Sequence, residues 1–250
     1  MVLVNKDAPL AEKIIEVIGG GTIYYSKNSG YLDLLFQDIK SIQKIAVLLN
    51  GNMRTPKIEA LHRLIDWINA RSTGGFNINK LDLDYSSLGS NPWLAGFIEA
   101  DGNFYCEYKL NSEGIAGLVK CYMRISQKQS YKPTISKDNS NFYIMEKIRE
   151  FLDVKVVTKI QRNKPNYIEL AYEVRTTKKS SCDFLINYLT KFPLFSSKHL
   201  DYLDWSEFYH IRISKQYKSL GGTLKLISLK NSMNTKRTQF NWDSLNRFYC

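Results

Sequence analysis

Residues 94–102 read Leu-Ala-Gly-Phe-Ile-Glu-Ala-Asp-Gly, and this short stretch decides which fold the chain can adopt. Its apolar spacing predicts a helix over residues 93–100. Gly96 and Ala100 lie four positions apart on one helix face, where small side chains let another backbone approach closely. Asp101 follows at the C-terminal end, where the helix dipole disfavours a carboxylate by about 0.3–1 kcal/mol. A hard divalent cation such as Mg²⁺ would reverse that penalty. Taken alone, the stretch also fits a buried helix that ends in an ordinary Asp-Gly turn.

The composition points to a globular protein with an anionic partner. The chain has 250 residues, of which 44% are hydrophobic and 24% are charged, as in ordinary globular domains. Its net charge of +11 favours a polyanion, most often nucleic acid, over the alternative of a generally basic protein. The longest apolar runs are about five residues, too short for a membrane span, so we expect no membrane partner.

Hydrophobic periodicity predicts two lobes joined by a linker. Residues 1–69 form a partial first lobe, residues 70–91 a linker rich in Gly, Asn, Asp, Ser and Thr, and residues 92–250 a second lobe with a basic tail. The first lobe is expected to hold a helix over 9–18, a hairpin over 22–37 and helices over 39–49 and 58–69. The second is expected to hold a helix over 93–100, strands over 103–110 and 118–127, a helix over 142–152, a hairpin over 154–175, and helices over 180–190 and 200–217.

The two lobes repeat one order of elements. Asn5-Lys6, followed by a helix, a hairpin and a helix, parallels Gln127-Lys128 followed by the same series. The second lobe has a helix and two strands before Gln127, and nothing before Asn5 corresponds to them. We therefore expect a first lobe that is truncated at its N-terminal side.

The stretch 94–102 closely resembles the LAGLIDADG motif, from which it departs at Phe97 and Glu99, both common variants. Four more segments are similar to proteins encoded in fungal mitochondrial group I introns, namely residues 54–64, 192–198, 199–205 and 230–242. The sequence is therefore identified as a member of the LAGLIDADG homing endonuclease and maturase family that lacks the first motif. The resemblance implies an α+β fold with two pseudo-symmetric αββαββα lobes, saddle-shaped antiparallel sheets and a truncated first lobe.

The resemblance also implies a site. In this family two motif helices pack together, and each supplies an acidic residue that holds a metal ion. It implies Asp101 as a catalytic carboxylate and metal ligand, Gln127 as a polar active-site residue and Lys198 as a basic residue near the attacking water. Mg²⁺ is the expected cofactor if cleavage occurs. Glu99 is expected to pack or cap instead of binding metal. The expected lobe interface consists of Leu94, Gly96, Phe97 and Ala100.

Alternation along the strands predicts one polar and one apolar sheet face, and the resemblance implies that the polar face lies in the major groove of DNA. The residues expected to contact nucleic acid are Tyr105, Glu107, Lys109, Lys120, Tyr122, Arg124, Lys128, Lys159, Gln161, Arg162, Lys236 and Arg237, with Tyr167, Glu169 and Arg175 extending the face. Lys236 and Arg237 belong to the tail and are expected to contact phosphates. A merely solvated sheet face would show the same alternation.

Residues 1–90 contain no second acidic motif. Asp7 is followed by Ala-Pro, and Asp66 lies in an amphipathic helix with no Gly after it. One carboxylate does not make a two-carboxylate metal clamp. Either another polypeptide supplies the missing third of the first lobe, or two copies of the Asp101 helix pair, or the chain does not cut DNA.

These features leave three functions open. We expect a maturase that binds group I intron RNA and assists its splicing, because nucleic-acid binding survives the loss of a complete cutting site. The alternative is a Mg²⁺-dependent homing endonuclease that makes double-strand breaks and is completed by a partner segment or a dimer. The third is a structural nucleic-acid-binding protein or a decayed remnant. The resemblance to proteins encoded in fungal mitochondrial introns implies a location in the mitochondrial matrix. The first residues are neither a signal nor a transit peptide, so we expect a protein that works there to be made in the organelle.

Overall fold

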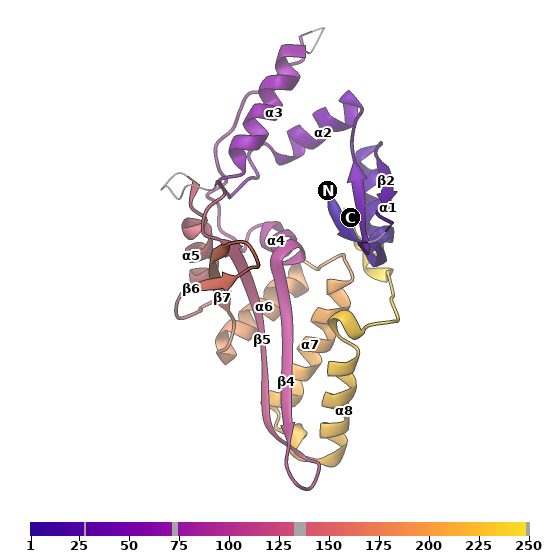
Figure 1. Cartoon of the computed structure of the whole chain (residues 1–250), viewed down its shortest axis with the longest axis vertical. Coiled ribbons are helices and arrows are strands. Elements are labelled where there is room, and N and C mark those ends of the chain that lie inside the picture. The colour runs from indigo at the N-terminus through magenta and orange to yellow at the C-terminus, as the bar shows by residue number, and fades with distance from the viewer. Residues whose placement is uncertain (28, 72–74, 133–138, 249–250) are drawn as a thin grey trace. The chain divides into compact units, whose positions relative to one another are not determined.

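The computed structural model of the chain describes all residues except 28, 72–74, 133–138 and 249–250. It divides into two compact units (Figure 1). Unit 1 comprises residues 1–87 and 130–144, and unit 2 comprises residues 88–129 and 145–250. Within the part of the chain described, no helix is long and apolar enough to cross a membrane.

Unit 1 is built from a small sheet and three helices. Its elements are β1 (Val2–Val4), a 3₁₀ turn η1 (Asn5–Asp7), α1 (Ala8–Ile18), β2 (Thr22–Tyr25), β3 (Tyr31–Leu35), α2 (Ile39–Leu49) and α3 (Ile58–Arg71). The strands are antiparallel in the order β1-β3-β2. Gly19 ends α1 in the left-handed conformation at φ 88°, which glycine adopts at little cost.

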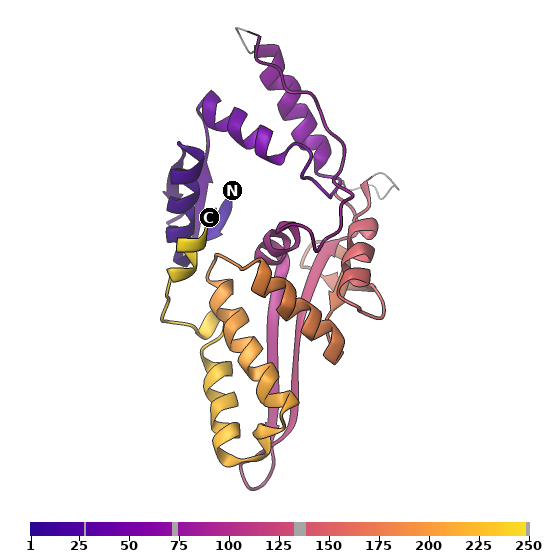
Figure 2. The ribbon, with the colours of Figure 1, turned by 180° about the vertical axis from the view of Figure 1, so that it is seen from behind.

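Unit 2 carries the longer sheet and a helical layer. Its elements are α4 (Trp93–Asp101), β4 (Gly102–Leu110), β5 (Ala116–Lys128), α5 (Phe142–Phe151), which begins in unit 1, β6 (Thr158–Asn163), β7 (Ile168–Arg175), α6 (Lys179–Lys191), α7 (Lys198–Ile213), η3 (Gln216–Lys218), α8 (Leu220–Asn231), η4 (Asn234–Lys236) and η5 (Asp243–Arg247). The antiparallel order is β4-β5-β7-β6. Figures 1 and 2 show α7 and α8 covering one face of β4 and β5 and leaving the other face open.

The core of unit 2 lies between this sheet and the helices. Trp205 and Phe208 of α7 are fully buried, and the ring of Phe104 on β4 lies 5.5 Å from that of Trp205, centroid to centroid. Thr176 is also fully buried, and its hydroxyl accepts a hydrogen bond of 2.9 Å from the backbone N–H of Met123. The apolar side of the predicted alternation is therefore the side that packs on the helices.

The sheets confirm the internal repeat. β1-β3-β2 in unit 1 has the same antiparallel neighbour order as β5-β7-β6 in unit 2, and the intervening helices α1 and α5 occupy the same place in the sequence of elements. Among the described residues of unit 1, nothing corresponds to α4 and β4.

Of the expected linker over 70–91, residues 72–74 lie outside the described residues, and the contacts of the part up to residue 87 are with unit 1. The side chain of Asn69 bonds both the N–H and the C=O of Ile78, at 2.9 and 3.0 Å. Lys80 pairs with Asp66 at 2.6 Å. Residues 130–144 return to the same unit, where Lys132 pairs with Glu59 at 2.7 Å.

The helix α8 was not predicted from the sequence, because Gly221 and Gly222 interrupt its pattern. The Ser219 hydroxyl caps it by accepting from the N–H of Gly222. A Cβ at Gly222 would lie 2.0 Å from the carbonyl oxygen of Gln216, so the preceding turn requires glycine there. The helix expected over 200–217 correspondingly ends at Ile213.

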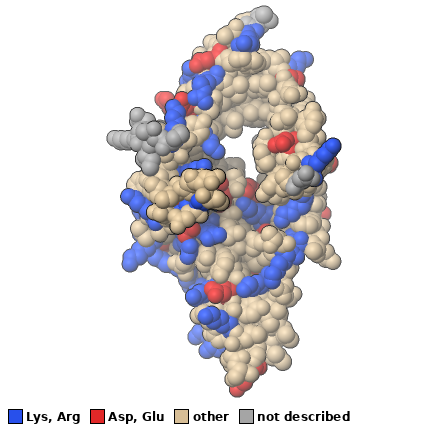
Figure 3. Space-filling model, in the orientation of Figure 1, with Lys and Arg blue, Asp and Glu red and all other residues tan. Residues whose placement is uncertain are grey.

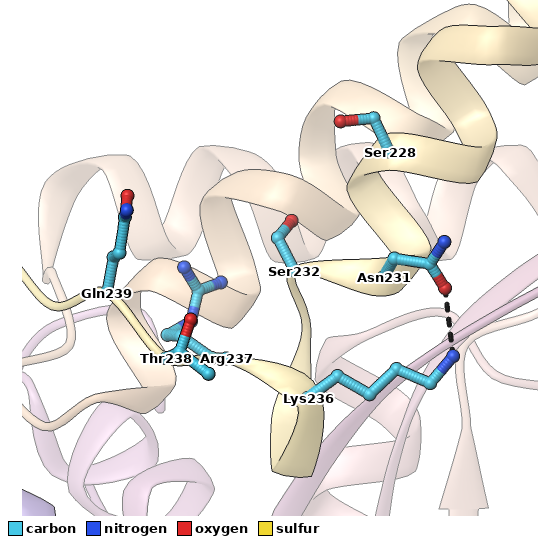
Figure 4. A pocket seen from close by; sticks show the side chains of 7 residues that line it. All are labelled: Ser228, Asn231, Ser232, Lys236, Arg237, Thr238 and Gln239. Carbon is cyan, nitrogen blue, oxygen red and sulfur yellow. Dashed lines mark hydrogen bonds between the residues drawn. The ribbon is translucent and has the colours of Figure 1, made fainter.

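The basic tail closes on α7 through a buried ion cluster. Arg237, with 10% of its side chain exposed, bonds Asp201 at 3.1 Å and Asp204 at 2.6 Å. Lys236 beside it bonds only the Asn231 side chain among the partners drawn in Figure 4, at 2.8 Å. Both residues line a polar cavity of about 470 Å³ (Figure 4), together with Ser228, Asn231, Ser232, Thr238 and Gln239.

Arg237 and Lys236 should differ in their effect on stability. Arg237→Ala leaves two largely buried carboxylates without their cation, so the free energy of unfolding should fall by about 3 kcal/mol. Lys236→Ala is the matched control and should change it by less than about 0.5 kcal/mol. Urea unfolding followed by circular dichroism measures both, and equal losses for the two variants would contradict the structural role of Arg237.

Candidate functional site

The sequence places Asp101 at the point where a helix passes directly into a strand. Asp101 is the last residue of α4, and Gly102 is the first residue of β4. A Cβ at Gly102 would lie 2.7 Å from the Ile98 carbonyl oxygen, so glycine is needed for this abrupt change of direction. The Asp101 side chain is exposed, as a carboxylate that acts on an external ligand must be.

Gln127 meets Asp101, as the resemblance implied. Its side-chain amide nitrogen donates a hydrogen bond to Asp101 Oδ2. Gln127 lies near the end of β5 and is half-buried, opposite Tyr172 of β7. The bond fixes the orientation of the Asp101 carboxylate from a residue 26 positions away in the sequence.

Glu99 has a structural role, as expected from its place in the motif. Its carboxylate accepts hydrogen bonds from the backbone N–H groups of Phe195 and Ser196 and from the Ser196 hydroxyl. Burial raises the pKa of Glu99, and these three hydrogen bonds oppose that rise. Glu99 therefore ties α4 to the segment before α7 and does not face an external ligand.

Lys198 reaches the same helix end from the first residue of α7. Its ammonium donates to the carbonyl oxygens of Ile98 and Glu99, at 3.0 and 2.7 Å. A cation here compensates the negative end of the α4 dipole. The two carbonyls that Lys198 contacts belong to residues three and two positions before Asp101 on α4. The predicted role of Lys198 beside an attacking water stays a prediction.

The donor chemistry of the site fits a hard divalent ion only in part. The described residues contain no group of three or more His, Cys, Asp and Glu side chains able to hold a metal. Asp101 offers one carboxylate with a hydrogen-bonded, fixed orientation. Mg²⁺ is commonly held by one or two carboxylates together with substrate phosphates and water. Asp101 would hold such an ion when phosphate oxygens complete its shell.

The motif helix has one covered and one open side. Leu94 and Ile98 are fully buried, whereas Gly96 and Ala100 are exposed, and a Cβ at Gly96 would meet nothing within 4 Å. Phe97 lies between these sides and stacks on Trp93 with centroids 4.8 Å apart. Leu94 points about 200° around the helix from Gly96 and lies on the covered side, whereas the predicted lobe interface as a whole stays a prediction.

The open face of the unit 2 sheet is polar, aromatic and basic along β4 and β5, as the alternation predicted. Phe104, Cys106, Val119, Cys121, Met123 and Ile125 are buried on the other side. Tyr105 stacks on Tyr122 directly opposite, with centroids 4.7 Å apart, and Glu107 lies opposite Lys120. Figure 3 shows Lys and Arg side chains gathered on this face of unit 2.

Two arginines of the same face are held by carboxylates. Arg162 on β6 bonds Glu169 at 2.8 Å, and this contact lowers the pKa of Glu169; Arg162 also bonds the Ser126 hydroxyl. Arg175 on β7 bonds Glu173 at 2.5 Å. Glu173 was missed from the sequence, although its alternation with Arg175 along β7 was available as a signal.

Two predicted contact residues lie on the wrong side of the sheet. Lys159 pairs with Tyr172 and Gln161 with Leu170, and these partners continue the row of Gln127 on the side opposite Arg124. Arg162, one position after Gln161, is on the same side as Arg124. The prediction placed all three together, which strand alternation forbids. Lys159 and Gln161 are both exposed, but on the other face of the sheet from Arg162.

The two predicted contact residues of the tail, Lys236 and Arg237, have different surroundings. Lys236 is exposed beside an open polar cavity, and its predicted phosphate contact stays a prediction. Arg237 is corrected, because its guanidinium is largely buried and bonds Asp201 and Asp204. Lys109 and Lys128 are exposed on their strands, as a contact to nucleic acid requires.

The sheet of unit 1 has a different character. The side that does not pack on α1 carries Val2, Val4, Thr22, Tyr24, Tyr31, Asp33 and Leu35. Along these described strand positions, the side has one acidic residue and no Lys or Arg. A polyanion is therefore favoured by the unit 2 sheet and not by its repeat.

Comparisons with known proteins agree with this geometry. A family model described as "LAGLIDADG endonuclease" matches residues 94–209, which span α4 to most of α7. The "Intron-encoded DNA endonuclease aI3" of Saccharomyces cerevisiae is 29% identical over 98% of this chain, which spans 64% of that relative's length. The "Probable intron-encoded DNA endonuclease aI1" of Mycosarcoma maydis is 32% identical over 46% of this chain and 93% of its own length.

Solved structures share the fold. The crystal structure of the I-LtrWI LAGLIDADG homing endonuclease bound to target DNA matches with a TM-score of 0.69 at 20% identity, over 95% of this chain and 87% of that one. The LAGLIDADG homing endonuclease I-GzeII in complex with its DNA target matches with a TM-score of 0.66 at 19% identity, over 95% and 88%. Together with the motif helix and its repeat, these similarities show that the chain belongs to the LAGLIDADG endonuclease family.

Proposed function

We propose that this chain binds double-stranded DNA across the open face of the unit 2 sheet and supplies Asp101 as one carboxylate of a metal-dependent phosphodiester hydrolysis site. The observation that carries the proposal is the position of Asp101, exposed at the end of α4 and oriented by Gln127 on a strand of that sheet. Both similar structures described above are bound to target DNA, which supports the same substrate.

Electrostatics and shape both suit a duplex. Lys109, Lys120 and Lys128 are exposed on two neighbouring strands, so they can neutralise phosphates and release counterions. A sheet surface with polar side chains on one side can enter the major groove and reach base edges. The aromatic pair Tyr105 and Tyr122 keeps the centre of the face flat and partly dry.

The residues around Asp101 have distinct parts in the proposed chemistry. A divalent ion held by Asp101 and phosphate oxygens would polarise the scissile phosphate and lower the pKa of a bound water. Gln127 holds the carboxylate in one orientation. Lys198 holds the helix end in place through the carbonyls of Ile98 and Glu99, and in the proposed site its charge would stabilise the reacting phosphate. Glu99 fixes the same turn from the opposite side and bears no part in the reaction.

The site proposed here is one half of the pair that the family uses. The described residues of unit 1 offer no second acidic residue in the position of Asp101, because they contain no counterpart of α4. We propose that a second carboxylate comes from a further polypeptide segment, seated where Gly96 and Ala100 leave the α4 backbone open. A second copy of this chain is the other source of such a helix.

A second candidate function is assistance of RNA splicing. The net charge of +11 and the basic sheet face serve a structured RNA as well as a duplex, and neither depends on a complete cutting site. We propose this maturase role as the alternative, with a mitochondrial matrix location in either case, since the relatives are encoded in fungal introns.

Binding should depend on the unit 2 sheet. Lys120→Ala should weaken binding of the chain to a duplex selected from a random library, and it should reduce the slope of log affinity against log salt by about one. Lys179 is an exposed lysine on α6 that pairs with Asp183 one turn along the same helix, so Lys179→Ala is the control and should leave the slope unchanged. Fluorescence anisotropy over a salt series measures both, and equal slopes would contradict the assigned face.

Asp101 should couple DNA binding to a divalent ion. In Ca²⁺ compared with EDTA, the wild-type chain should bind its selected duplex several-fold more tightly, and Asp101→Asn should abolish that gain because the carboxylate no longer holds the ion. Asp66→Asn, an exposed carboxylate on α3, is the matched control. An unchanged gain in Asp101→Asn would refute the metal role.

A cleavage assay with the wild-type chain tests whether the site is only half complete. In Mg²⁺ the chain alone should give no double-strand product from that duplex. Double-strand products that disappear in Asp101→Asn would show that the chain, alone or as a homodimer, holds a complete site; sedimentation of the DNA complex distinguishes the two.

The two candidate functions differ in their preferred ligand. If DNA is the ligand, a selected duplex should displace labelled group I intron RNA at equal phosphate concentration, and the reverse competition should fail. The maturase role predicts the opposite order. Competition anisotropy at physiological salt measures it, because low salt would let both polyanions bind alike.

A further inference from the structure

Arg175 is held in one conformation at the end of β7. One terminal nitrogen bonds Glu173 Oε1 at 2.5 Å, and the guanidinium carbon lies 4.5 Å from the centroid of the Tyr122 ring. Tyr122 itself is stacked on Tyr105. The guanidinium is therefore fixed both in its plane and at one edge, which removes most of the entropy cost of ordering it on binding.

The Arg175 guanidinium is held in place but keeps N–H donors for an external ligand. The Glu173 side chain is 7% exposed, whereas the Arg175 side chain is 42% exposed. The bond to Glu173 takes one of the five N–H groups of the guanidinium. Arg162 differs, because its two terminal nitrogens bond Glu169 and Ser126 within the protein.

The position of Arg175 favours base contact over phosphate contact. β7 lies between β5 and β6 in the sheet, and Arg175 is paired with β5 at the end of β7, two residues beyond the pairing with β6. In a sheet laid into a major groove, a side chain beside a neighbouring strand on the open face would lie over base edges more than over the phosphate rims. Arg124 lies directly opposite Arg175 on the same face. Two like charges in register are unfavourable by themselves and become favourable when electron-rich acceptors lie above them.

We propose that Arg175 reads a guanine in the major groove of the bound DNA, with Glu173 and Tyr122 as positioning residues. Guanine presents the O6 and N7 acceptors that match a guanidinium edge, and this is the commonest specific arginine contact. The inference rests on the proposed DNA-binding function and adds to it the residue and the base that set one position of the target.

The test is a selection from a random-sequence duplex library followed by sequencing, with wild type, Arg175→Ala and Arg175→Lys in parallel. Wild type should select a target with a guanine at one required position. In both variants the preference for guanine at that position should fall about tenfold, while the base preferences at the other positions should stay unchanged. Lysine retains the charge, so its failure to restore the preference separates base reading from simple attraction. Arg63→Ala, an exposed arginine on α3, is the control.

The outcomes separate the inference from the function beneath it. A wild-type target whose base preferences are all retained in Arg175→Ala overturns the inference and leaves DNA binding standing. A uniform loss of affinity with unchanged preferences also overturns it, in favour of a phosphate contact. Absence of any enrichment by wild type overturns both the inference and the proposed function.

Variants of the positioning residues give a second readout. Glu173→Gln and Tyr122→Leu should reduce the same guanine preference several-fold, while Tyr122→Phe, which keeps the ring under the guanidinium, should retain it. Circular dichroism checks that each variant is folded. A preference that is unchanged in both Glu173→Gln and Tyr122→Leu would overturn the positioning roles, since a purely structural effect would not move a single base position.

Discussion

The exchange of hydrogen bonds around the last turn of α4 is the constraint on which the site depends. The Glu99 carboxylate accepts from the backbone of the segment before α7, and Lys198 at the start of α7 donates back to the carbonyls of Ile98 and Glu99. Each partner satisfies groups that the other chain segment would otherwise leave unpaired. The end of the helix is thereby fixed on two sides, and Asp101 is presented at a defined point beside Gln127.

The two units use the same order of elements for different surfaces. In unit 2 the open sheet side carries lysines, arginines and a stacked tyrosine pair, whereas the corresponding side in unit 1 carries Val2, Tyr24, Tyr31 and Leu35. Internal repetition constrains the backbone, because the buried side of each strand must pack on a helix. It does not constrain the exposed side, so each copy can acquire its own ligand.

The sequence predicted those features that depend on local periodicity. Helix α2 was predicted at its observed bounds over residues 39–49, and the exposed pair Gly96 and Ala100 follows from helical spacing alone. The resemblance brought Asp101, Gln127 and Lys198 together from three separate elements, which no local pattern would have joined. The errors have physical reasons as well. Gly221 and Gly222, the second of which the preceding turn requires, concealed α8. Lys159 and Gln161 were grouped with Arg162 because the alternation of sides along β6 was not applied to them. Arg237 was misassigned because its buried acidic partners lie more than thirty residues away.

Unit 1 is discontinuous in the sequence, since residues 130–144 belong to it although unit 2 residues precede and follow them. That segment is anchored by Lys132 to Glu59 and by the edge contact of Tyr143 with Tyr85. No single cut of the polypeptide can therefore release either unit intact. A domain exchange between relatives would have to transplant two separate pieces of gene, and a fusion or truncation designed at one junction would leave an orphaned segment behind.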